Sequence, residues 1–237
     1  VVDPFLAPRC VPDFLDRWIV RKSILDALES HREQFTGKLL DVGCGQMPYK
    51  SYLTSAAGKE IKYIGLDFEV NPIHDNTPDI TWKDGKIPLA DASVDYAMAT
   101  EVFEHCPEPE DVMKEIFRVL KPGGLLFFTV PFLWPLHEVP FDQYRYTPYA
   151  LERHLGNSGF DDIRLKAMGG WDASMGQMLG LLVRRRRMNK YIRTCLSYML
   201  TPIIWYLYKQ DKKNVSSFRG SMMITGVSGT AKKNCVT

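Results

Sequence analysis

The chain has 237 residues, 45% of them hydrophobic, and a formal net charge of +2. This length can bury one substantial core, and the near-neutral charge argues against a nucleic-acid partner for the whole chain. The cysteines are scattered, odd in number and without CxxC spacing, which predicts reduced thiols in the cytosol rather than disulfides or a zinc site: Cys10, Cys44, Cys106, Cys195 and Cys235. The first residues lack the pattern of a secretory signal.

Apolar spacing over residues 12–35 predicts one amphipathic helix or two short ones. Apolar runs and helical runs then alternate. Strands are predicted at 38–44, 61–68, 79–85, 93–103, 125–132 and 161–168, with a last strand within 217–233. Helices are predicted at 109–120, which "KPGG" stops, and at 147–160, which opens with a threonine cap and a proline.

Strand–helix alternation with strands that are apolar throughout predicts an α/β fold built on a doubly wound, mostly parallel sheet with helices on both faces. We expect four segments. They are an N-terminal helical cap (1–37), the ligand-binding core (38–180), a basic and aromatic helical insert (181–215), and a closing strand with its tail (216–237).

The first predicted strand ends in "LLDVGCGQMPY", where a doubly wound sheet places its ligand. Gly43 and Gly45 would let the backbone approach that ligand closely. A dinucleotide site would carry a third glycine where Pro48 stands, and Asp41 would repel a pyrophosphate. The loop therefore suits a cationic or zwitterionic ligand, and an ordinary tight turn is the alternative.

Two further acids end the next two predicted strands. Asp67 is placed to accept hydrogen bonds from both ribose hydroxyls, and Asp84 to accept one from an adenine amine. Alone, each fits a surface turn as well. Together with Asp41 they describe a site for an adenosine that bears a positive charge and no phosphates.

These segments resemble the class I, Rossmann-like, S-adenosylmethionine-dependent methyltransferases, over about residues 38–168 with a closing strand near 221–232. The similarity rests on "LLDVGCG", "YIGLDF", "IPLADASVDYAMATEVFEH" and "LKPGG", and is closest to the quinone and small-molecule branch. It implies a seven-stranded sheet with a final antiparallel strand. The variant "GCGxxPY", which lacks the family's third glycine, marks relatives near sugar or cell-envelope chemistry.

The resemblance also implies roles for individual residues. In the family, the glycine loop after the first strand wraps the methionine part of the cofactor. The acid that ends the second strand, here Asp67, binds ribose, and the acid that ends the third, here Asp84, faces adenine. The residue that ends the fourth strand, here Thr100, lies against the cofactor. The predicted cofactor-binding residues are Asp41, Gly43, Gly45, Asp67, Phe68, Asp84, Gly85 and Thr100.

Methyl transfer needs alignment more than a strong catalyst, although an oxygen nucleophile can need a general base. His137, in the loop after the fifth strand, and His105, after the fourth, are the predicted catalytic residues. For His105, a structural hydrogen bond at the helix start is the competing interpretation. Arg145 in the same loop could pair with Asp142 or bind an acidic acceptor. No His/Asp/Glu spacing indicates a metal.

The insert carries "RRRR" before "YIRTCLSYMLTPIIWYLY", an 18-residue stretch with Arg193 and Pro202 inside it. Such a stretch is short for crossing a bilayer. A cap over the acceptor pocket, contact with an anionic membrane surface through 184–213, and RNA binding are the three interpretations.

The sequence thus predicts an S-adenosylmethionine-dependent methyltransferase acting on a small-molecule, sugar or lipid-linked acceptor, by O-methylation. It is expected in the cytoplasm, with a peripheral position at the inner membrane face as an option and no nucleic-acid partner. A dinucleotide-dependent oxidoreductase, an RNA methyltransferase and a non-catalytic relative are the alternatives.

Overall fold

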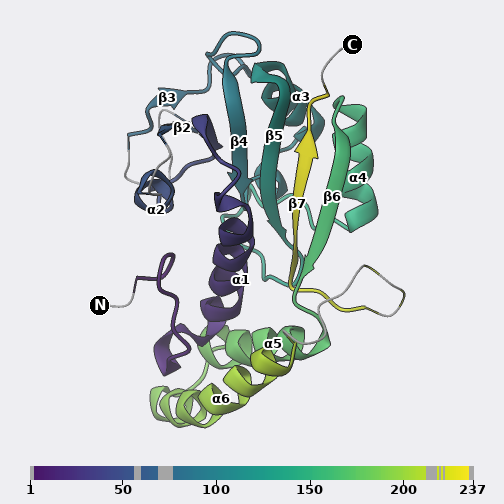
Figure 1. The fold of residues 1–237 in the computed structure, drawn as a ribbon. Coiled ribbons are helices and arrows are strands. Elements are labelled where there is room, and N and C mark those ends of the chain that lie inside the picture. Colours follow the sequence, from purple (N-terminus) through teal and green to yellow (C-terminus); the bar gives the residue numbers. More distant parts are fainter. Residues whose placement is uncertain are drawn as a thin grey trace. The chain divides into compact units, whose positions relative to one another are not determined.

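A computed structural model describes residues 3–55, 60–68, 77–211, 218, 220 and 222–234. The strands form one seven-stranded sheet in the order β3-β2-β1-β4-β5-β7-β6 (Figure 1). Their bounds are β1 Gly37–Val42, β2 Ile61–Asp67, β3 Ile80–Thr81, β4 Val94–Thr100, β5 Leu120–Pro131, β6 Asp161–Met168 and β7 Gly226–Lys232. The reversal of strand order beside β1 is the point at which ligands bind in such sheets.

The first five strands of this sheet run parallel. In β1, Leu40 lies opposite Ile64 of β2 on one side and opposite Ala97 of β4 on the other. This register brings the carboxyl ends of β1, β2 and β4 to the same edge, so the acids that end β1 and β2 are neighbours.

The last strand in the sequence, β7, runs antiparallel to its neighbours. Gly123 bonds to Lys233, whereas Phe132, further along the chain, bonds to Thr225. The partner number falls as the residue number rises, which is the antiparallel pattern. The predicted antiparallel final strand is confirmed, and it lies between β5 and β6.

Strand β5, next to the central strand β4, is buried on both faces along most of its length. Phe127 lies against His31 and Phe35 on one face, and Phe128 packs against Phe103 on the other. Because both faces exclude water, β5 reads as a continuous apolar run rather than an alternating one.

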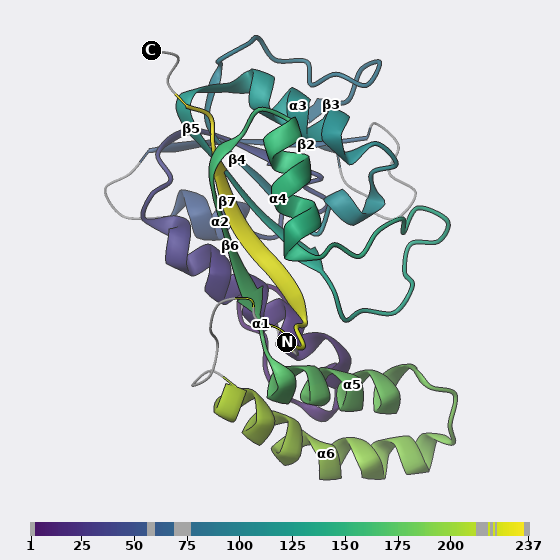
Figure 2. The same cartoon turned by 90° about the vertical axis from the view of Figure 1, so that its right-hand side faces the viewer.

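Helices cover both faces of the sheet, with α3 and α4 on the same side (Figure 2). The sheet's helical elements are α2 Lys50–Thr54, η2 Phe103–His105, α3 Pro109–Val119 and α4 Pro148–Asn157. The Thr147 hydroxyl accepts a hydrogen bond from the Ala150 amide, so α4 begins at the predicted cap. The predicted doubly wound α/β fold is confirmed.

The chain divides into two compact units. The sheet unit consists of Ser30–Pro131, Pro135–Leu165 and Ser228–Thr237, and the helical unit of Val1–Glu29, Phe132–Trp134 and Lys166–Val227. The helical unit thus takes in segments from both the predicted N-terminal cap and the predicted insert.

The helical unit is built from η1 Pro12–Phe14, the first part of α1 Leu15–Arg32, α5 Trp171–Arg185 and α6 Lys190–Asp211. Its core consists of Leu15, Trp18, Ile19, Ala173, Val183, Ile204 and Tyr208. A Cβ at Gly180 would lie 2.3 Å from the Leu15 carbonyl oxygen, so α5 needs glycine there to approach α1. The insert boundary expected at residue 181 falls inside α5.

Candidate active site

The turn after β1 is fixed by its glycines. Gly43 and Gly45 have φ angles of 66° and 48°, which glycine adopts without strain. The Gly43 amide donates to the Leu66 carbonyl of β2 at 2.9 Å. A Cβ at Gly43 would lie 2.6 Å from Val102, so the turn after β1 touches the segment after β4.

Asp41 is a buried carboxylate near the end of β1. One of its oxygens accepts a hydrogen bond from the Tyr63 hydroxyl of β2, and Oδ1 has no hydrogen-bond partner among the described residues. Burial raises the pKa of Asp41 to about 7; the Tyr63 bond lowers it and the charge of Asp67 raises it. An oxygen buried without a partner is costly, so this position suits a ligand that brings a donor or a positive charge.

Asp67 ends β2 and ties the site together. Its Oδ2 accepts from the Gly45 amide at 2.9 Å, and its Oδ1 accepts from the Phe68 amide at 2.7 Å. These two bonds hold the Asp67 carboxylate at the junction of the glycine turn and the end of β2. The side chain of Phe68 is 62% exposed beside it, as an apolar surface on which a flat ring could stack.

The loop after β1 lacks the family's third glycine, and Met47 closes the loop instead. Met47 takes a φ of 50°, and its amide donates to the Cys44 carbonyl at 2.7 Å. A Cβ at Gly65 of β2 would lie 2.7 Å from the Met47 methyl carbon. The loop therefore closes by laying Met47 over a glycine in the neighbouring strand.

Asp84 and Gly85 lie away from the strand ends. Two backbone bonds join Lys83 and Lys86, and Asp84 and Gly85 between them have φ angles of 50° and 74°. This is a type I′ turn, and both residues are exposed. β3 ends at Thr81, so the expectation that Asp84 ends a strand is wrong. Its adenine contact stays a prediction.

Thr100 is the last residue of β4 and lies opposite Thr129 of β5. The next residue, Glu101, has a φ of 56° and accepts from the Thr129 hydroxyl at 2.9 Å. The chain turns sharply here and enters η2. Thr100 lies at the same sheet edge as Asp41 and Asp67, as the sequence predicts.

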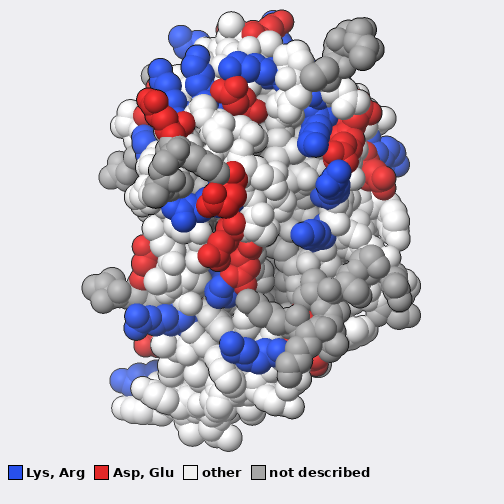
Figure 3. Space-filling view, viewed as in Figure 1, with Lys and Arg blue, Asp and Glu red and all other residues white. Residues whose placement is uncertain are grey.

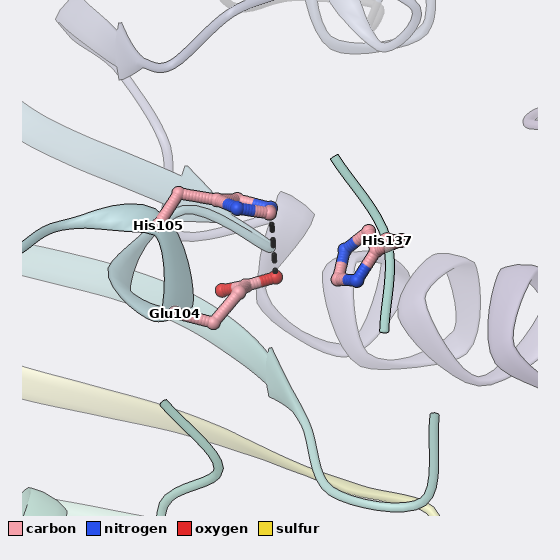
Figure 4. Close-up of side chains that lie close together, drawn as sticks. All are labelled: Glu104, His105 and His137. Atoms are coloured by element: carbon pink, nitrogen blue, oxygen red, sulfur yellow. Dashed lines mark ion pairs between the residues drawn. The ribbon is translucent and has the colours of Figure 1, made fainter. Parts of the chain in front are cut away.

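The two predicted catalytic histidines lie together. His105 ends η2, His137 comes from the loop after β5, and their ring centroids are 4.8 Å apart. The buried carboxylate of Glu104 completes the cluster, with its Oε1 3.7 Å from His105 Nε2 (Figure 4). The sequence predicted the two histidines but not Glu104, whose only signal was a second acid in "EVFEH", directly before His105.

Each histidine is oriented through Nδ1. His137 Nδ1 lies 3.1 Å from Asp142 Oδ2, and His105 Nδ1 lies 3.3 Å from the Phe141 carbonyl oxygen. The His105 contact resembles the structural role weighed in the sequence analysis. Burial lowers the pKa of His137 more than Asp142 raises it, which favours the neutral ring.

Arg145 forms a two-pronged ion pair with Asp142, at 2.6 and 2.8 Å. Of the two interpretations open from the sequence, the structure shows the internal pair. Although burial alone would raise it, the bonds from Arg145 and the His137 amide lower the pKa of Asp142 to about 2. Asp142 is thus a permanent anion that orients His137.

Burial, reinforced by the charge of Glu101, raises the pKa of Glu104 well above its usual value. Neither carboxylate oxygen of Glu104 has a hydrogen-bond partner among the described residues, and the side chain is 0% exposed. A buried acid without partners is a common mark of a functional site.

Comparisons with known proteins identify a methyltransferase domain in the chain. Residues 40–128 match the family described as a methyltransferase domain. An uncharacterized methyltransferase of Mycobacterium bovis strain BCG is 34% identical over 145 residues, which cover 56% of this chain and 56% of that protein. The chain therefore spans little more than half the length of this relative.

Solved structures share the fold at low sequence identity. A SAM-dependent methyltransferase of Thermotoga maritima has a TM-score of 0.56 at 16% identity, covering 95% of this chain and 99% of the other. One from Archaeoglobus fulgidus has a TM-score of 0.53 at 17% identity, covering 89% and 94%. The domain match, the methyltransferase relative and the shared fold together support a class I, Rossmann-like S-adenosylmethionine-dependent methyltransferase.

Proposed function

We propose that the chain transfers a methyl group from S-adenosylmethionine to an oxygen of a small-molecule, sugar or lipid-linked acceptor. The observation that carries this proposal is the pair of buried acids, Asp41 and Asp67, beside a glycine turn at the carboxyl ends of β1 and β2. Two carboxylates there repel a diphosphate and attract a cationic nucleoside. This opposes the dinucleotide-dependent alternative.

The residues present fit this cofactor. Asp41 Oδ1, buried and without a hydrogen-bond partner among the described residues, can accept from an ammonium group, and the Asp67 carboxylate at the end of β2 is the predicted acceptor for ribose hydroxyls. Gly43 and Gly45 have positive φ angles and carry no side chains, so the backbone of this turn can approach a bound ligand closely. When bound, the cofactor supplies an electrophilic methyl on a positively charged sulfur.

The acceptor is expected beside the histidine cluster, at the carboxyl ends of β4 and β5. His105 and His137 are the groups there that could activate a hydroxyl oxygen, and Tyr144, Tyr146 and Arg145 belong to the same loop. Alignment of that oxygen with the methyl group accounts for most of the rate gain in such a transfer.

S-adenosylhomocysteine is expected to bind the full chain and raise its unfolding temperature, whereas NAD is expected to do neither. Asp67→Ala should weaken the binding by about 1–3 kcal/mol, because ribose loses a charged acceptor and the Gly45 amide loses its partner. Isothermal titration calorimetry and thermal shift measure both effects.

Asp162→Ala is the matched control. This exposed-surface aspartate pairs with Arg164 and Lys232 and is expected to leave the dissociation constant unchanged. Stabilisation by NAD alone would overturn the proposed function. Equal binding by wild type and Asp67→Ala would remove Asp67 from the site.

The helical unit carries an uncovered apolar surface. On α5 the side chains of Trp171, Met175, Met178 and Leu182 recur at helical spacing, and all four are exposed. On α6 the exposed side chains include Tyr191, Ile192, Tyr198, Met199, Ile203, Trp205 and Tyr206. The part of α6 visible in Figure 3 is accordingly poor in charge. Across the described residues, no helix combines the length and apolarity needed to cross a membrane.

We propose that this surface rests on an anionic membrane, which suits a lipid-linked acceptor and a peripheral position at the cytoplasmic face. The basic run Arg184–Arg187 follows the apolar stripe of α5 directly, as in segments that lie in the headgroup region. Arg186 and Arg187 are exposed.

The protein is expected to co-sediment with vesicles rich in phosphatidylserine and much less with pure phosphatidylcholine. The double variant Leu182→Ser, Trp205→Ser should lose most of this binding, because it removes apolar area that the membrane would cover. Arg186→Glu with Arg187→Glu should lower it by about 1 kcal/mol or more per charge.

Tyr149→Ser, at an exposed aromatic residue on α4 of the sheet unit, serves as the control and should change nothing. A wild-type protein that stays in the supernatant with both vesicle types would rule out the membrane contact. Concentration-dependent self-association lost in the serine variants would instead assign the surface to a protein interface.

A further inference from the structure

Glu104 is the most unusual acidic residue that the proposed chemistry leaves unused. It is 0% exposed, and both of its oxygens lack a hydrogen-bond partner among the described residues. Arg145 in the neighbouring loop donates to Asp142 at 2.6 and 2.8 Å and to the Tyr144 carbonyl at 2.8 Å. A carboxylate buried in this way is stable only when a positive charge or several donors face it.

The two histidines beside Glu104 are oriented to present nitrogen lone pairs. Each has Nδ1 directed at an oxygen acceptor, the Phe141 carbonyl for His105 and the Asp142 carboxylate for His137. When Nδ1 carries the proton, Nε2 carries the lone pair. A carboxylate or carbonyl behind the distal nitrogen is the usual support of a metal-bound histidine.

The ligand atoms of Glu104, His105 and His137 all lie within 4.8 Å of one another (Figure 4). Around a tetrahedral zinc ion, ligand atoms at about 2.1 Å stand about 3.4 Å apart. The His105 Nε2 to Glu104 Oε1 distance of 3.7 Å is already close to that value. His105 and His137 keep 19% and 26% of their side chains exposed, so an ion can enter from solvent.

We propose that Glu104, His105 and His137 bind a divalent transition-metal ion, with Zn²⁺ the best fit. Two imidazole nitrogens and one carboxylate oxygen are intermediate between hard and soft ligands. This donor set suits zinc better than calcium or magnesium, which prefer oxygen ligands. Three protein ligands leave a fourth position open, which is the pattern of catalytic rather than structural zinc.

The open position gives this site a role that rests on the proposed function. A hydroxyl oxygen of the acceptor that binds the ion becomes more acidic and loses its proton to solvent near neutral pH. The resulting alkoxide or phenolate is the nucleophile that forms the new O–CH₃ bond as the S–CH₃ bond breaks. In this proposal the histidines bind the metal ion and do not act as general bases. The predicted acceptor is then a compound whose hydroxyl group can bind a metal ion, such as a catechol or a sugar diol.

The metal alone tests the site. Full-length protein without a tag, stripped with a chelator, is expected to bind one Zn²⁺ per chain by calorimetry and to give visible Co²⁺ absorption bands of tetrahedral strength. Glu104→Gln and His137→Gln should each weaken Zn²⁺ binding at least about 100-fold, beyond the effect of losing an outer-shell partner.

His154→Gln is the matched control, since His154 forms an ordinary pair with Glu110 at 2.8 Å outside the cluster. It should bind Zn²⁺ like the wild type, as should Cys106→Ser. Absence of stoichiometric binding, or equal binding by the Gln variants of Glu104 and His137, would overturn the metal site. Binding of S-adenosylhomocysteine to the metal-free protein separates the two proposals, because it survives failure of the metal site and is lost if the proposed function fails.

Discussion

Replacing Asp41 with asparagine is expected to abolish a pH-dependent part of the protein's stability and to weaken S-adenosylmethionine binding. In the ligand-free protein, burial raises the pKa of Asp41 from 3.8 to about 7. The folded state therefore keeps a proton on Asp41 over a pH range in which the unfolded state has lost it.

The sign of the effect follows from this raised pKa. The contribution of Asp41 to stability is fully present below pH 3.8 and is lost as the pH rises through about 7. Each pH unit between these values costs about 1.4 kcal/mol, so the whole window amounts to roughly 4 kcal/mol. Asparagine does not ionise, and its oxygen can still accept from Tyr63.

The difference in unfolding free energy between wild type and Asp41→Asn should therefore shift by roughly 4 kcal/mol in favour of the variant between about pH 4 and pH 8. Urea unfolding at several pH values measures this, and groups common to both proteins cancel. A difference that stays constant with pH would show that Asp41 does not carry the raised pKa.

The cofactor reverses the preference of Asp41 for its neutral form. A ligand with an ammonium and a sulfonium favours the ionised carboxylate, so binding should release close to one proton near pH 6 and affinity should rise with pH through about 7. Calorimetry in two buffers of different ionisation enthalpy counts that proton. Asp41→Asn should release none and bind more weakly at all pH values.

The sheet could be predicted because its signals are local. The apolar runs at β1, β2, β4 and β5 and the Thr147 cap of α4 each follow from a few adjacent residues. By contrast, α5 was not predicted. Its glycines, Gly176 and Gly180, are poor helix formers, and they are explained by the close approach of Ile19 and Leu15 from α1.

The positions of candidate residues could be predicted where strand ends define them, but not where distant loops meet. Asp41 and Asp67 lie near the carboxyl ends of β1 and β2, as predicted, because each comes at the end of an apolar run. Asp84 was misplaced at a strand end because "KDGK" reads equally well as a strand end and as the type I′ turn it forms. Glu104 was missed because its burial depends on the loop after β5, about thirty residues further along the chain.

Replacing Asp211 with alanine is expected to destabilise the helical unit by about 2–4 kcal/mol. Asp211 is the buried last residue of α6, and it caps the start of α5. Its two oxygens accept from the Gly170 amide at 3.0 and 2.9 Å, and Oδ1 also accepts from the Ala173 amide at 3.1 Å. Alanine would leave the buried Ala173 amide and the half-buried Gly170 amide unpaired at the positive end of a helix.

Tryptophan fluorescence can follow this change selectively, because four of the five tryptophans belong to the helical unit: Trp18, Trp134, Trp171 and Trp205. The variant should show a fluorescence transition at a lower temperature, while S-adenosylhomocysteine binding, which depends on the sheet unit, persists below that transition.

Deleting residues 184–213 would test the apolar surface less well than point substitutions do, because the deletion removes both this cap and the core residues Ile204 and Tyr208.

Asp172→Ala is the control for Asp211, since it removes a half-buried acid from the same first turn of α5 and should cost only about 0.3–1 kcal/mol. Asp211→Asn keeps one acceptor oxygen and should fall between the two. If Asp211→Ala is no more destabilising than Asp172→Ala, the α6 terminus does not hold α5 in place. The pairing of α5 with α6 would then depend on their shared apolar core alone.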